Sequence, residues 1–93
     1  MKTNDPAKTF LSVVIPAYNE AGKIAKAIGD VSEYLGKKGL AAEIIVVDDG
    51  SRDETVEHAE ATPHGDTVLR ILRNPVNRGK GYAIKCGVLE AAG

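Results

Sequence analysis

The sequence has one cysteine, Cys86, among its 93 residues, and aromatic residues make up only 4% of it. A lone cysteine excludes a disulfide within the chain and favours a reducing compartment such as the cytosol. We expect Cys86 to be a small buried residue of a helix. Because aromatic side chains are scarce, the core must consist of Val, Ile, Leu and Ala. Disulfide-stabilised secreted scaffolds are therefore excluded.

Net charge and long apolar runs are lacking as well. The formal net charge is -1, so we expect no nucleic-acid partner and no attraction to an anionic membrane through bulk charge. No apolar run approaches the roughly 18 residues of a membrane-spanning helix, and residues 1–10 lack the apolar stretch of a signal peptide. We expect a cytoplasmic protein, with a peripheral position at the cytoplasmic face of a membrane as a second option.

What is present is an alternation of short apolar runs and amphipathic segments. The chain of 93 residues is long enough for one domain, which we place at 10–93 after a flexible tail at 1–9. Strands are expected at 11–15, 43–47 and 67–72, and helices at 21–37, from 51 onward and at 82–92. Ile84, Val88 and Ala91 should form the inner face of the third helix. The order predicts an α/β fold in which helices cover both faces of a parallel, Rossmann-like sheet, giving three layers.

Proline, polar residues and glycine mark where these elements should begin and end. Pro16 should close the first strand because proline cannot donate to the ladder. Asn19 is the expected N-cap of the first helix and Gly39 its terminator. Residues 51–54 have the S-x-x-E spacing of a capping box that would open the second helix.

The polar segments that follow the three strands carry the chemistry. Because parallel strands point the same way, these loops should meet at one edge of the sheet, where ligands bind in such folds. Tyr18 could stack on a base, and a carboxylate at the end of the second strand could accept from the ring N–H of uracil or guanine. Lys80, between Gly79 and Gly81 at the start of a helix, could pair with a diphosphate. Together the loops predict a nucleoside diphosphate site.

Other phosphate and metal motifs fit less well. A Walker A loop would need glycine in place of Asn74 and serine or threonine in place of Gly81, and a dinucleotide fingerprint would need glycine in place of Ile84. Asp48 and Asp49 are adjacent on a strand, so at most one of them faces a ligand, which argues against a metal site made by the pair. Two simpler interpretations stay open, an ordinary turn after the second strand and a solvated lysine in the third loop.

Three segments, VIPAYNE at 14–20, VVDDGS at 46–51 and NRGKGYA at 77–83, resemble the opening motifs of glycosyltransferase family 2. The likeness is to its dolichyl-phosphate mannosyl- and glucosyltransferase branch. It implies the N-terminal part of a GT-A nucleotide-diphospho-sugar transferase fold. It also implies inverting transfer of a hexose from UDP-glucose or GDP-mannose, the former slightly favoured, to a polyprenyl or dolichyl phosphate or a saccharide. A divalent cation, Mg²⁺ or Mn²⁺, is implied for the complete enzyme.

The resemblance assigns residues to a nucleotide-binding site and none to catalysis. The implied set is Pro16, Ala17, Tyr18, Glu20, Val47, Asp48, Asp49, Lys80 and Gly81. Those of the first loop would line the nucleoside. Asp49 would accept a hydrogen bond from the base, Asp48 would shape the turn, and Lys80 would lie near the diphosphate.

One motif of the family is missing. The Asp-x-Asp motif that holds its metal does not occur after Lys80. We therefore expect the donor-binding front of a transferase, without most metal ligands, that does not turn over unaided. The alternative is a non-catalytic nucleotide-sugar-binding or protein-interaction module. In the family's strand order 3-2-1-4 the first strand would lack a neighbour, so we expect either self-association through that open edge or residual instability.

Overall fold

The computed structural model describes residues 10–91, and the expected alternation of strand and helix is confirmed. In order the elements are β1 (Phe10–Ala17), α1 (Ile24–Lys38), β2 (Ala41–Asp49), α2 (Thr55–Ala61), β3 (Val68–Asn74) and α3 (Lys80–Glu90). The proposed tail at 1–9 and the end of the proposed domain at 92–93 lie outside the described residues. No helix within 10–91 is long and apolar enough to cross a membrane.

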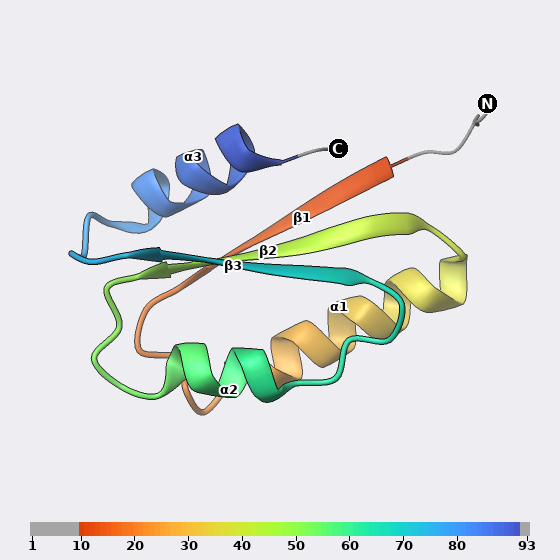
Figure 1. Cartoon of the computed structure of the whole chain (residues 1–93), viewed down its shortest axis with the longest axis horizontal. Helices are drawn as coiled ribbons and strands as arrows, with labels where there is room; N and C mark the ends of the chain where they lie inside the picture. The colour runs from red at the N-terminus through yellow and green to blue at the C-terminus, as the bar shows by residue number, and fades with distance from the viewer. Residues whose placement is uncertain (1–9, 92–93) are drawn as a thin grey trace.

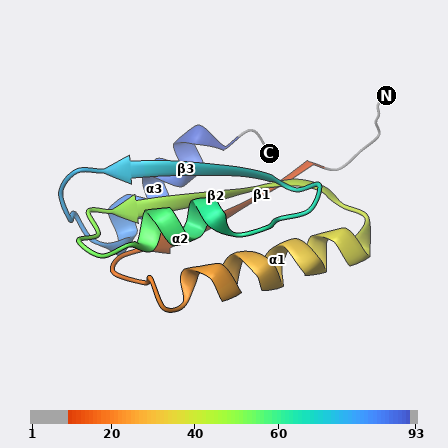
Figure 2. The same cartoon turned by 60° about the horizontal axis from the view of Figure 1, so that its bottom comes forward.

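The three strands form one parallel sheet in the order β1-β2-β3. Ile15 of β1 pairs with Val46 of β2, and Val46 pairs with Ile71 of β3. Helices α1 and α2 lie on one face of the sheet and α3 on the other (Figures 1 and 2). The predicted three-layer α/β/α architecture is therefore confirmed.

The central strand β2 is buried from residue 42 to residue 49. Its side chains alternate between two clusters: Ile44 and Val46 face α1 and α2, whereas Ile45 and Val47 face α3. Each of these side chains contributes roughly 1.5–3 kcal/mol of hydrophobic free energy when it is fully buried. The same alternation sends the two aspartates at the end of β2 to opposite faces of the sheet.

The predicted inner face of α3 is wrong for two of its three residues. Ile84 is 41% exposed and Val88 is 60% exposed, whereas Ala83 and Gly87 are buried. A Cβ atom on Gly87 would lie 2.4 Å from Cγ1 of Val14, so the helix axis approaches β1 too closely for a larger side chain. Of the expected face, only Ala91 packs against the cluster that Ile45 and Val47 form with α3. Cys86 packs against the same cluster, but it is half-buried rather than buried as predicted.

The predicted N-caps of the first two helices and the predicted closure of the first strand at Pro16 are also wrong. The strand β1 continues through Pro16, which an edge strand tolerates because one side of its ladder is unpaired. Asn19 has a φ of 52° and lies well before α1, and its Oδ1 accepts from the Arg52 N–H. Ser51 accepts from the Asn19 N–H instead of capping α2. The prediction for Gly39 is confirmed, since it ends α1 with a φ of 64°.

Candidate functional site

The loops that follow the three strands meet at the carboxyl edge of the sheet, at the left of Figure 1. They enclose a hollow of about 290 Å³ that lies between the end of β1, the end of β2 and the start of α3. It is lined by Pro16, Ala17, Tyr18, Glu20, Asp49, Asn77, Gly79, Lys80 and Ala83. The structure thus brings Tyr18, Asp49 and Lys80 together, as the sequence predicts.

Three of the nine predicted site residues do not line this hollow. Val47 is fully buried beneath α3, Asp48 faces the opposite side of the sheet, and Gly81 is exposed on the first turn of α3. The predicted set lacked three other lining residues, Asn77, Gly79 and Ala83. All three stand in the NRGKGYA motif at 77–83, whose position was the available signal, but the Ala83 side chain itself carries no chemical signal.

Asp49 is buried and binds the third loop. Its Oδ1 accepts from the Arg78 N–H at 2.9 Å and its Oδ2 accepts from the Gly79 N–H at 2.8 Å. Each carboxylate oxygen keeps one further lone pair, so an additional donor from a ligand is compatible with this arrangement. The carboxylate therefore fixes the backbone that leads into α3, a role that the sequence did not reveal.

Close approach of the second and third loops requires glycine at position 50. Gly50 has a φ of +77°, and a Cβ atom on it would lie 2.7 Å from the Asn77 backbone nitrogen. Any other residue at this position would push the two loops apart.

Asp48 shapes the turn after β2, as the family resemblance implies. Its Oδ2 accepts from the Ser51 N–H at 3.1 Å, and its buried Oδ1 has no hydrogen-bond partner. The two aspartates therefore point apart. Among the residues that the structure describes, no group of three His, Cys, Asp or Glu side chains could hold a metal ion. The donor set in 10–91 does not fit the implied cation, and no step is assigned to it.

The start of α3 offers an anion site. Gly79, the residue before the helix, has a φ of 95°, and no side chain caps the first turn. Uncapped N–H groups at a helix start attract anions. Lys80 is exposed at the hollow, and the Arg78 guanidinium carbon lies 5.6 Å from the centre of the Tyr82 ring. Two cationic side chains therefore flank the start of α3.

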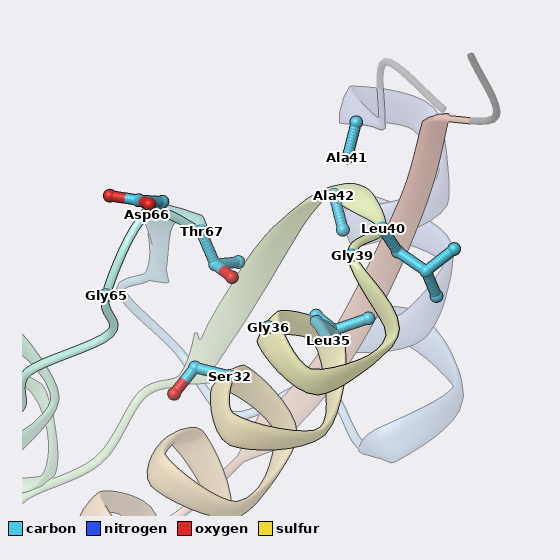
Figure 3. A pocket seen from close by; sticks show the side chains of 10 residues that line it. All are labelled: Ser32, Leu35, Gly36, Gly39, Leu40, Ala41, Ala42, Gly65, Asp66 and Thr67. Carbon is cyan, nitrogen blue, oxygen red and sulfur yellow. The ribbon is translucent and has the colours of Figure 1, made fainter.

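A larger hollow of about 700 Å³ lies at the opposite end of the sheet, between the end of α1 and the loop before β3 (Figure 3). Glycine, alanine and leucine make up most of its lining, and Asp66 is its one charged residue. It contains none of the predicted site residues. The polar chemistry lies in the smaller hollow.

Comparisons with known proteins agree with this geometry. Residues 12–93 match the sequence model of glycosyl transferase family 2. A dolichyl-phosphate beta-glucosyltransferase of Saccharomyces cerevisiae is 40% identical over 95 residues, which cover 96% of this chain and 28% of that protein. Proteins of the same name from Trichomonas vaginalis and Homo sapiens are 39% and 37% identical, over 96% and 89% of this chain.

The chain spans less than a third of the length of these relatives, 29% of the Trichomonas protein and 28% of the human one. The matched region nevertheless includes β1 from residue 12 onward, all of β2 and β3, and every residue that lines the smaller hollow. The match therefore covers the whole candidate site. The chain belongs to glycosyl transferase family 2.

Proposed function

We propose that this chain supplies the donor-binding part of a dolichyl-phosphate glucosyltransferase that uses UDP-glucose. The observation that carries the proposal is the meeting of Tyr18, Asp49 and Lys80 around one hollow. The names of the relatives favour glucose over mannose as the transferred sugar and dolichyl phosphate as the acceptor.

Each wall of the hollow suits one part of a nucleotide sugar. The Tyr18 ring is 42% exposed at the rim, where a base could stack on it. The Asp49 carboxylate also lines the hollow and could accept from a ring N–H. Lys80 and the start of α3 would hold the diphosphate.

In the proposed reaction an oxygen of the acceptor phosphate attacks the anomeric carbon of the sugar. The bond from that carbon to the diphosphate oxygen breaks, its electron pair leaves with UDP, and the configuration inverts. Because negative charge grows on the departing diphosphate, Lys80 and the uncapped N–H groups of α3 would stabilise the transition state. We propose that the complete enzyme works at the cytoplasmic side, in contact with the membrane that holds its acceptor.

Nucleotide titration of the 93-residue chain tests this proposal. Thermal unfolding is followed with UDP, GDP and pyrophosphate at increasing concentrations. A ligand at a hundred times its Kd stabilises the folded state by about 2.7 kcal/mol, so we expect an upward shift in Tm, larger for UDP than for GDP. The absence of any nucleotide-dependent shift would support a protein-interaction module instead.

Substitution of Lys80 by alanine tests the diphosphate site. We expect Lys80→Ala to weaken the binding of UDP and of pyrophosphate equally, by roughly ten- to a hundredfold, because one charge-assisted contact contributes about 1.5–3 kcal/mol. The control is Lys85→Ala, which removes an exposed lysine of α3 that does not line the hollow. Equal losses in both variants would contradict a specific role for Lys80.

A further inference from the structure

Three consecutive backbone N–H groups of the first loop donate to side chains of the second loop and of the first residue of α2. The pairs are Asn19 N to Ser51 Oγ at 2.8 Å, Glu20 N to Thr55 Oγ1 at 2.8 Å and Ala21 N to Asp53 Oδ2 at 3.2 Å. A fourth bond runs the other way, from the Arg52 N–H to Asn19 Oδ1 at 2.9 Å. The second loop therefore holds the segment that follows Tyr18, in the part of the chain that carries two lining residues of the candidate site.

Thr55 is the buried centre of this arrangement. It is the first residue of α2 and has no exposed surface. Its hydroxyl donates to Asp53 Oδ1, so the remaining lone pairs of the oxygen are directed at other donors, among them the Glu20 N–H. Asp53 Oδ1 also accepts from the Thr55 N–H at 3.0 Å. The hydroxyl is thereby fixed in one orientation.

The element that carries Thr55 is itself anchored. Val56 and Ala59 of α2 are buried, and the latter belongs to the cluster beneath the sheet. One helical turn after Thr55, His58 donates from Nδ1 to the Ala21 carbonyl oxygen at 2.7 Å. Neither Thr55 nor Asp53 lines the hollow. Their hydrogen bonds to the Glu20 and Ala21 N–H groups connect them to a ligand in the hollow through the first loop.

We propose that Thr55, oriented by Asp53, is a positioning residue that holds Tyr18 and Glu20 in the geometry needed to bind the base of the nucleotide. This inference rests on the proposed function. It assigns α2 to the positioning of Tyr18 and Glu20 at the nucleoside end, whereas Lys80 and the start of α3 act at the diphosphate end. Substitutions in α2 and at Lys80 should therefore affect different ends of the ligand.

The test compares UDP with pyrophosphate, because only UDP has a base. Thr55→Val keeps the side-chain volume but removes the hydroxyl. We expect it to lower the affinity for UDP by about tenfold and the affinity for pyrophosphate by less than about twofold. Thr55→Ser should restore UDP binding. The matched control is Thr62→Val, which removes a buried hydroxyl at the other end of α2 that donates to the His58 carbonyl oxygen at 2.7 Å. It should lower stability without changing the ratio of the two affinities.

Amide hydrogen exchange gives a readout that needs no ligand. In Thr55→Val the amides of residues 19–21 should exchange at least about tenfold faster than in the unsubstituted chain, while the amides of Arg78 and Gly79 should not change. Faster exchange at both places, or an equal loss of UDP and pyrophosphate affinity, would show a merely structural role and overturn the inference. Failure of the unsubstituted chain to bind UDP, with the exchange pattern as expected, would overturn the proposed ligand and leave the positioning of the loop established.

Discussion

At the scale of single residues, Asp48 and Asp49 show how adjacent identical side chains acquire different work. They are neighbours on one strand, so they face opposite sides of the sheet. Asp48 holds its own turn through the Ser51 N–H, whereas Asp49 holds the third loop through the Arg78 and Gly79 N–H groups. Strand alternation predicted that the pair would diverge, but it could not identify the partners of Asp49, which lie 29 and 30 residues away.

Replacement of Asp49 by asparagine should break one of its two hydrogen bonds to the backbone of the third loop. An amide has one acceptor oxygen, so its NH₂ group would face one of the two backbone donors that the carboxylate now accepts. We expect a loss of about 1–3 kcal/mol in the free energy of unfolding, the usual result of leaving a buried donor unpaired. Urea unfolding at pH 7 measures it. Asp66→Asn, in the exposed turn before β3, is the control, and an equal effect in both variants would contradict the assignment.

A second prediction concerns acid stability through Asp53. The hydrogen bond from Thr55 holds the pKa of the Asp53 carboxyl below its ordinary value. A carboxyl whose pKa is lower in the folded state stabilises the fold fully above its unfolded pKa of about 3.9. That contribution is lost as the pH falls through the lowered value.

We therefore expect the urea concentration at the unfolding midpoint of the unsubstituted chain to decrease as the pH is lowered below about 4. The decrease should be smaller in Asp53→Asn. Asp66→Asn, whose carboxyl is exposed, should follow the unsubstituted chain. If the urea midpoint decreased equally with pH in Asp53→Asn and in the unsubstituted chain, the role of Asp53 would be contradicted.

At the scale of elements, the sequence predicted the strands better than the inner face of the third helix. Apolar runs bounded by turn residues located all three strands. The run was clearest for β2, which is buried on both sides and therefore needs an unbroken apolar segment. The predicted inner face of the third helix was wrong because Ile84 and Val88 have helical spacing, whereas the contact of α3 with β1 is made by small residues. Asn19 and Ser51 misled because their side chains bind across loops rather than within a helix. Local patterns contain no information about such distant partners.

The contact between α3 and β1 makes a prediction for Gly87. Alanine favours a helix by about 1 kcal/mol over glycine, yet here its Cβ would lie 2.4 Å from Cγ1 of Val14 and 3.2 Å from Cγ2 of Val47. Because both neighbours are stiff and packed, we expect Gly87→Ala to cost about 1–3 kcal/mol in unfolding free energy. Gly29→Ala in α1 is the matched control, since nothing lies within 4 Å of that position. It should stabilise the fold, and the same gain at Gly87 would contradict the close packing.

At the scale of the whole molecule, the parallel sheet explains why the site could be located from the sequence. All three strands end at one edge, so the polar segments after them had to meet there. The same topology gives the described chain two edge strands, β1 and β3. Of these, β1 lies beside α3, whose outer residues Ile84, Val88 and Leu89 are exposed. An unpaired strand next to exposed apolar residues favours association with another chain.

We expect the chain to self-associate through β1, and sedimentation velocity over a range of concentrations measures this. The average mass should rise above the 9.8 kDa of one chain as the concentration increases. Leu11→Lys places a charge on β1 at a position that is 40% exposed, and it should keep the chain monomeric because a charged edge resists pairing. Val68→Lys makes the same change at a 53% exposed position on β3 and should leave association unchanged. A chain that stays monomeric at every concentration would rule out the β1 interface, and suppression by Val68→Lys alone would move the interface to the opposite edge.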